Sequence, residues 1–196
     1  MGMTGTARAN LITNGDFSDG LNGWSLINAD TDSSAPDPSV FVGTTGDTAG
    51  VLTIQNANDA AGSGVTQTFA IGDADTYIFE FDYGYGWVNN YSSVELFWQD
   101  ANGNAISGWY SFTFQAENNS VKEWPLHHSI TLKRGPNTAN GGDIPVDAAA
   151  VTIDIKQHYA GYQTYFDNIS FTAVPEPASL GLLALGGLAL LARRRR

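Results

Sequence analysis

The stretch Tyr77-Ile-Phe-Glu-Phe-Asp-Tyr-Gly-Tyr-Gly-Trp87 alternates large aromatic residues with small or acidic ones. Because successive side chains of a β-strand point to opposite faces, this pattern predicts a strand with one aromatic face and one polar face. Shorter alternating runs lie on both sides of it, separated by segments rich in Gly, Asn, Asp and Pro. No run before residue 175 has the apolar spacing of a helix. The sequence therefore predicts an all-β fold.

The other expected strands are short. About ten short strands with turn signals between them are typical of a β-sandwich. One is expected within residues 121–132, where Pro125 predicts an edge or a break because proline cannot donate a ladder hydrogen bond. The remaining runs begin near Leu11 and continue at residues 40–42, 51–54, 65–69, 94–98, 109–114, 151–155 and 165–171.

Two stretches at the ends of this region resemble the galactose-binding-like jelly rolls, which include carbohydrate-binding modules. One is Asn10-Leu-Ile-Thr-Asn-Gly-Asp-Phe17 with the following Gly20-Leu-Asn-Gly-Trp24, and the other is Phe166-Asp-Asn-Ile-Ser170. Asn14-Gly15 is also a strong turn signal, with apolar anchors at Phe17 and Trp24. The resemblance implies an antiparallel jelly-roll β-sandwich over residues 10–174.

The C-terminal tail differs from everything before it. Pro175, Glu176 and Pro177 precede an uncharged apolar run, residues 178–192, which ends at Arg193, Arg194, Arg195 and Arg196. A membrane span needs about 20 apolar residues, so this slightly shorter run predicts a single C-terminal apolar helix that enters a membrane. The arginines favour a cytoplasmic end. A buried helix and a plain C-terminal anchor are the alternatives.

The order of these three elements closely resembles the PEP-CTERM sorting signal of Gram-negative bacteria, over residues 175–196. The resemblance implies export, transient anchoring in the inner membrane through residues 178–192, and processing near Pro175–Pro177 by an exosortase-type membrane protease. The product is then expected at the cell surface, on the outer membrane or in the extracellular matrix, often beside exopolysaccharide. Residues 1–9 lack an apolar leader core, but Ala7-Arg8-Ala9 has the form of a cleavage site, so these residues are expected to be a leader remnant or disordered.

The charge of residues 10–174 argues against nucleic acid as a partner. This region has four Lys and Arg and nineteen Asp and Glu, a formal charge of −15. Such a field repels nucleic acid and anionic lipid headgroups, and it suits an extracellular or cation-binding domain. The chain contains no Cys, so it has no disulfide framework.

The sequence has more large aromatic residues than a core of this size needs. Aromatic rings offer flat apolar faces with polar edges, which suit the C–H face of a sugar. For each ring, packing in the core is the alternative. The candidate glycan contacts are Tyr83, Tyr85, Trp87, Trp98 and Trp109.

The jelly-roll resemblance also implies a structural calcium ion that joins the opening loop to the last strand. Asp167 matches the family's last-strand Asp, and Asp16 and Asp19 lie in the opening loop. Ser18 stands where the family has a ligand Glu. The alternative role for Asp167 is to accept backbone N–H bonds in a turn.

Glu80 and Asp82 lie on one face of the aromatic strand, roughly 7 Å apart by strand rise, a separation near that of glycosidase carboxylates. No further carboxylate follows within residues 83–87, so the chain is not expected to be an enzyme. We expect an exported surface or matrix protein with a carbohydrate-binding jelly roll. A matrix-structural protein with no ligand pocket is the alternative, and a glycoside-active enzyme is third.

Overall fold

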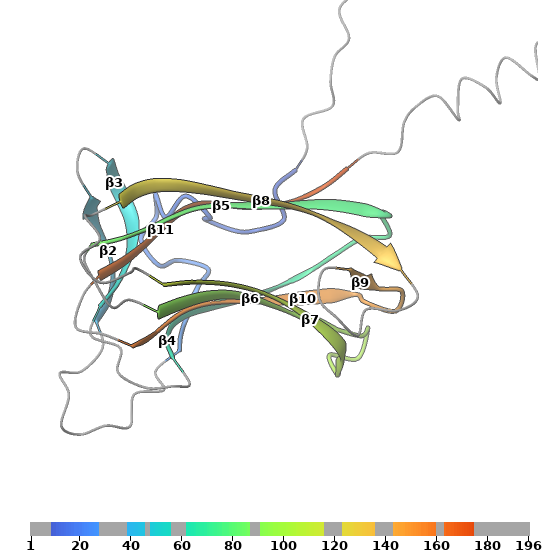
Figure 1. Cartoon of the computed structure of the whole chain (residues 1–196). Helices are drawn as coiled ribbons and strands as arrows, with labels where there is room; N and C mark the ends of the chain where they lie inside the picture. The colour runs from blue at the N-terminus through green and yellow to red at the C-terminus, as the bar shows by residue number, and fades with distance from the viewer. Residues whose placement is uncertain are drawn as a thin grey trace, which may run out of the picture.

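The computed structural model describes residues 9–27, 39–45, 48–55, 62–86, 91–115, 123–135, 143–159 and 163–174, apart from the side chains of residues 107–109 and 159. These residues form eleven strands in two layers (Figure 1). Within this part of the chain, no helix is long and apolar enough to cross a membrane. The helix expected over residues 178–192 lies outside the described residues.

One layer is a five-stranded antiparallel sheet. The strands lie in the order β1 (Ser25–Ile27), β4 (Ser63–Ala70), β10 (Ala150–Tyr159), β6 (Tyr91–Gln99) and β7 (Ala105–Gln115). Side chains alternate along β10, where Val151, Ile153 and Ile155 are fully buried and the residues between them are not. The sheet therefore has one apolar inner face and one polar outer face.

The other layer is a six-stranded sheet in the order β2 (Ser39–Thr45), β3 (Thr48–Gln55), β11 (Gln163–Ala173), β5 (Thr76–Tyr85), β8 (Glu123–Gly135) and β9 (Ile144–Pro145). Its pairs are antiparallel except for β8 with β9. The prediction of an all-β sandwich is thus confirmed.

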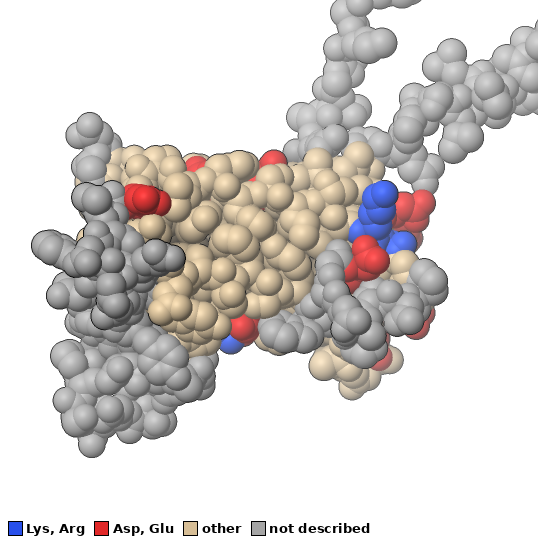
Figure 2. Space-filling view, in the orientation of Figure 1, with Lys and Arg blue, Asp and Glu red and all other residues tan. Residues whose placement is uncertain are grey.

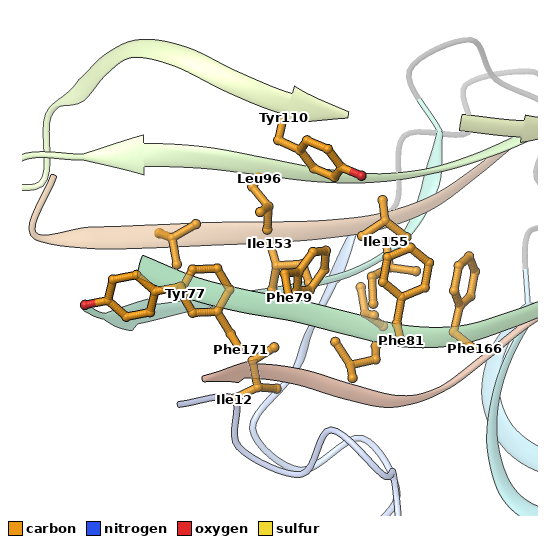
Figure 3. Packing of buried hydrophobic residues seen from close by; sticks show 14 of the residues in the cluster. Ile12, Tyr77, Phe79, Phe81, Leu96, Tyr110, Ile153, Ile155, Phe166 and Phe171 are labelled. Atoms are coloured by element: carbon orange, nitrogen blue, oxygen red, sulfur yellow. The ribbon is translucent and has the colours of Figure 1, made fainter. Parts of the chain in front are cut away.

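The core lies between the two inner faces (Figure 3). Phe79, Phe81 and Phe171 from the six-stranded sheet meet Ile153 and Ile155 from the five-stranded sheet, and all five are fully buried. The predicted anchors of the opening loop also pack together, since the rings of Phe17 and Trp24 have centroids 5.4 Å apart.

Some local features differ from the expected strands. Leu11 lies in no strand, and the neighbouring Asn10 forms only an isolated bridge with Thr172. Pro125 lies inside β8 and does not break it, but in the described sheet β8 pairs only with β5 at this position, so Pro125 is on an edge, where the pairing also shifts register. The short strands β1 and β9 have too few residues to show an alternating pattern.

Candidate functional site

The outer face of the five-stranded sheet carries a mixed aromatic and polar surface, which we call the outer patch. The ladder places Thr152 of β10 opposite both Phe97 of β6 and Thr68 of β4. It likewise places Asp154 opposite Glu95. These residues share a face because they are directly paired or two positions apart. The outer patch consists of Thr68, Glu95, Phe97, Gln99, Thr152, Asp154 and Lys156.

Lys156 forms ion pairs with both carboxylates of the outer patch, those of Glu95 and Asp154. Asp154 and Glu95 are like charges directly opposite each other, an arrangement that alone destabilises a sheet. The Lys156 Nζ lies 2.6 Å from Glu95 Oε2 and 3.6 Å from Asp154 Oδ2. The same ammonium lies 5.9 Å from the centre of the Phe97 ring, within the range of a cation–π contact. Two carboxylates, one ammonium and one aromatic ring therefore meet in one place.

The rest of the outer patch is a neutral hydrogen-bonded network. The Gln99 amide donates to the Thr152 hydroxyl at 3.0 Å, and the Thr152 and Thr68 hydroxyls lie 2.7 Å apart. Next to Lys156, the buried Ser93 hydroxyl and the His158 Nε2 lie 2.8 Å apart. The patch thus offers amide, hydroxyl and carboxylate groups around a half-buried ring, a combination that suits a ligand with both C–H faces and hydroxyl groups.

Of the five predicted glycan contacts, the structure describes the side chains of Tyr83, Tyr85 and Trp98, and these do not form a common exposed surface. Tyr83 lies between the layers, where its ring packs against Phe112 and Phe114 at 5.2 and 4.6 Å, and burial, followed by the Glu123 charge, raises its pKa. Tyr85 is half-buried at the end of β5.

Trp98 does not fit the predicted glycan contact, because it is 1% exposed and belongs to the core. Its strand alternates, so that Leu96 and Trp98 point inward while Phe97 points outward. Trp109 pairs with Phe97 in the ladder between β6 and β7, and its side chain lies outside the described part of the structure, as does all of Trp87.

The predicted calcium ligands lie on the six-stranded layer, where the opening loop meets β11. Asp167 is 6% exposed and accepts the Asn168 N–H at 2.7 Å. Its pKa is raised to about 6, chiefly by burial and also by the charges of Asp82 and Asp16, against the lowering effect of that hydrogen bond. The environment of Asp167 therefore opposes its negative charge and would favour a nearby cation.

A pocket of about 340 Å³ is lined by Asp16 and by Asn168, the chain neighbour of Asp167, whereas Asp167 itself does not line it. Asn14 and Asn168, which contribute to its wall, both adopt positive φ angles, 50° and 51°. Asp19 does not line the pocket, and its carboxylate accepts a bond from the Asn22 amide at 2.7 Å. Among the described residues, no three His, Cys, Asp or Glu side chains form a metal-binding cluster. The lining residues are Asn10, Ile12, Asn14, Gly15, Asp16, Asn168, Ile169 and Ser170.

The pair considered for glycoside hydrolysis, Glu80 and Asp82, lies on the outer face of β5. Asp82 is bonded by His127 Nδ1 and by the Asn168 amide, each at 2.8 Å. Glu80 accepts the Ser129 hydroxyl at 3.0 Å. Neither carboxylate lines the pocket beside Asp167, so both serve as cross-strand partners on this face.

Phe97 and Lys156 were not among the residues predicted from the sequence. The signal for Phe97 was present, because a large aromatic residue occupies the outward position of the alternating run Val94-Glu-Leu-Phe-Trp98. Lys156 gave no comparable signal, since its role depends on Glu95, which is 61 positions away in the chain and adjacent only after folding.

Residues 173–196 match the PEP-CTERM protein-sorting motif. The chain therefore carries a sorting signal of this kind, which indicates export with a membrane-anchored signal in Gram-negative bacteria. No curated protein matches the sequence.

Several solved structures share the fold at low sequence identity. The enzymatically active domain of tailspike protein 4 from bacteriophage CBA120 has a TM-score of 0.62 at 13% identity, over 84% of this chain and 21% of that one. The carbohydrate-binding module CBM4 has a TM-score of 0.54 at 14% identity, over 83% and 99%. The CBM22-1–GH10 modules of xylanase 10B from Clostridium thermocellum, complexed with xylohexaose, score 0.51 at 11% identity, over 86% and 28%. These likenesses place the sandwich among carbohydrate-binding-module jelly rolls in fold.

Proposed function

We propose that the protein is an exported, non-catalytic glycan-binding module of the cell surface or extracellular matrix, and that its outer patch contacts the glycan. The single observation that carries this proposal is the half-buried Phe97 ring among the carboxylates and ammonium of Glu95, Asp154 and Lys156. The ring would take the C–H face of a sugar, and the surrounding groups would bond its hydroxyls. The fold shared with carbohydrate-binding modules supports this reading.

The layer arrangement is compatible with such a role. The strand that leads into the sorting motif is β11, in the six-stranded sheet, whereas the outer patch lies on the five-stranded sheet. A chain held through its C-terminus would therefore carry the outer patch on the five-stranded sheet, which is not the layer that leads into the sorting motif. Processing by an exosortase-type protease and delivery to the surface or matrix are part of this proposal.

We also propose a structural calcium ion beside Asp16 and Asp167. Calcium prefers six to eight oxygen ligands, and the pocket offers carboxylate, amide and backbone oxygens. Burial, and to a smaller extent the charges of Asp82 and Asp16, raises the pKa of Asp167, and a cation there would offset both effects. Asp19, bonded to Asn22, is left out of this ligand set.

The test is retention of the domain, residues 10–174, on a panel of immobilised polysaccharides, with calcium and with chelator. We expect retention on at least one polysaccharide and its loss in Phe97→Ala. Phe41→Ala is the matched control, because Phe41 is an exposed aromatic residue (39%) on the six-stranded layer. Absence of retention on every polysaccharide would favour the matrix-structural alternative.

A further inference from the structure

The sorting motif begins inside the folded sandwich. The matching region starts at residue 173, and β11 extends to Ala173. Val174 is also hydrogen-bonded to the sheet, since its N–H donates to the Thr76 carbonyl at 2.8 Å. The residues just before Pro175 are therefore part of a sheet.

The end of β11 is held on both edges. On one side, Ser170–Ala173 pair with Tyr77–Glu80 of β5. On the other side, Asn10 and Leu11 lie along the strand, and Figure 1 shows this N-terminal segment beside the end of β11. Leu11 N–H donates to the Phe171 carbonyl at 2.9 Å. Strands held on both edges have few free backbone groups.

The Asn10 side chain makes most of the bonds on the N-terminal side. Its Oδ1 accepts the Phe171 N–H at 2.9 Å and the Ile12 N–H at 3.1 Å. Its Nδ2 donates to the Ile169 carbonyl at 3.2 Å. One side chain thus joins the first described residues of the sandwich to its last strand, and we call this contact the terminal latch.

The spacing between the sandwich and the apolar run is short. Residues 175–177 are the only residues between Val174 and the run at 178–192, and they extend at most about 11 Å. A protease that binds its substrate as an added strand needs free backbone groups on several residues around the cut. In the folded protein, backbone groups of residues 171–174 already form hydrogen bonds with β5 and with the N-terminal segment.

We propose that the terminal latch controls processing of the sorting signal: cleavage near Pro175–Pro177 takes place from a locally opened form in which residues 171–174 have left the sheet. The inference rests on the proposed exosortase-type processing. Cleavage from a transiently opened form follows the equilibrium population of that form when reclosing is fast. The rate of processing therefore depends on how firmly Asn10 and β5 hold the end of β11.

The experiment follows the full chain by pulse–chase in a Gram-negative host that performs PEP-CTERM sorting, with the mass of the protein reporting loss of the tail. Asn10→Ala removes the terminal latch and is expected to speed processing about tenfold. A second variant inserts about six Gly and Ser residues between Val174 and Pro175, which adds about 20 Å of reach without touching the sandwich. It is expected to be processed faster than the natural chain, and Asn10→Ala should add nothing to it.

The control is Gln67→Ala, which disturbs the opening loop away from β11. Gln67 bonds the Thr13 N–H and carbonyl and the Gly23 carbonyl at 2.9–3.0 Å. Its processing rate should match that of the natural chain. Equal rates for the natural chain and the spacer variant would overturn the inference, as would a Gln67→Ala acceleration equal to that of Asn10→Ala, which would indicate global unfolding. Failure of the spacer variant to be processed at all would refute the sorting proposal itself.

Discussion

Replacing Asp167 by Asn should stabilise the calcium-free protein at neutral pH. Asp167 is 6% exposed, and its pKa is about 6 in the folded protein against 3.8 for an unperturbed Asp. An Asn side chain keeps an oxygen that can accept the Asn168 N–H, but it cannot ionise. The substitution therefore removes the unfavourable charge and leaves the turn intact.

The magnitude follows from the pKa difference. A change of about two pKa units corresponds to about 3 kcal/mol, which is an upper value for this site. Because the folded state binds the proton more tightly, Asp167 contributes full stability below about pH 3.8 and loses it as the pH rises through about 6. Asp167→Asn should thus equal the natural protein near pH 4 and exceed it by about 1–3 kcal/mol at pH 8.

Urea unfolding at pH 4, 6 and 8, in chelator, measures this difference. Excess calcium at pH 8 should stabilise the natural protein and leave Asp167→Asn unchanged. Asp100→Asn is a control with the opposite expected effect on stability. Hydrogen bonds from Asn104 and Asn102 lower the pKa of the exposed Asp100, so its charge favours the folded state and the substitution should destabilise the protein at pH 8. A lower stability of Asp167→Asn than of the natural protein at pH 8 in chelator would show that the Asp167 charge does not destabilise the fold.

Substitutions at three further residues test individual contacts. Burial raises the pKa of Tyr110 to about 12, so the free energy of unfolding of the natural protein should fall by up to about 3 kcal/mol between pH 10 and 12. Tyr110→Phe should show no such fall, but it should be about 1 kcal/mol less stable at neutral pH because the bond to His128 is lost. Urea unfolding as a function of pH measures both effects. Arg134→Ala should destabilise the domain by about 2–4 kcal/mol, and Arg134→Lys should restore little of this stability. Equal denaturation midpoints for the natural protein and Arg134→Ala would contradict this prediction. The Arg134 guanidinium donates to several backbone carbonyls, those of Gly72, Pro145, Val146 and Ala148. Gly15→Ala should cost about 3 kcal/mol or more, because an added Cβ would approach the Ile169 carbonyl oxygen to 2.0 Å, and an unchanged melting temperature would show that the loop can shift.

The sequence predicted the fold well because alternation is a local signal. The aromatic strand and β10 each carry the period of two over enough residues to be recognised, and the Asn14-Gly15 turn and its anchors Phe17 and Trp24 lie close together in the chain. β11 does not alternate in this way, and its prediction came from the jelly-roll resemblance. The sorting motif was equally local, since its three elements follow one another directly.

The candidate site was harder to predict because it depends on pairings across strands. Trp98 was chosen for its size, but the alternation of β6 turns it inward and turns Phe97 outward. Lys156 becomes informative only when folding places it against Glu95. Asp167 was expected near Asp16 from the jelly-roll resemblance, and the effect of the Asp16 charge on its pKa agrees with that placement. The calcium ion itself stays a prediction.

Titration calorimetry of the domain with its best-retained polysaccharide tests whether Phe97 contacts the glycan. We expect Phe97→Ala to weaken binding about tenfold or more, because the ring surface that covers the sugar is lost. The melting temperature of this variant should change little, because Phe97 is a half-buried residue of the outer face. Phe41→Ala should bind like the natural domain. Unchanged affinity in Phe97→Ala, or an equal loss in both variants, would contradict the assignment of the glycan site to the outer patch.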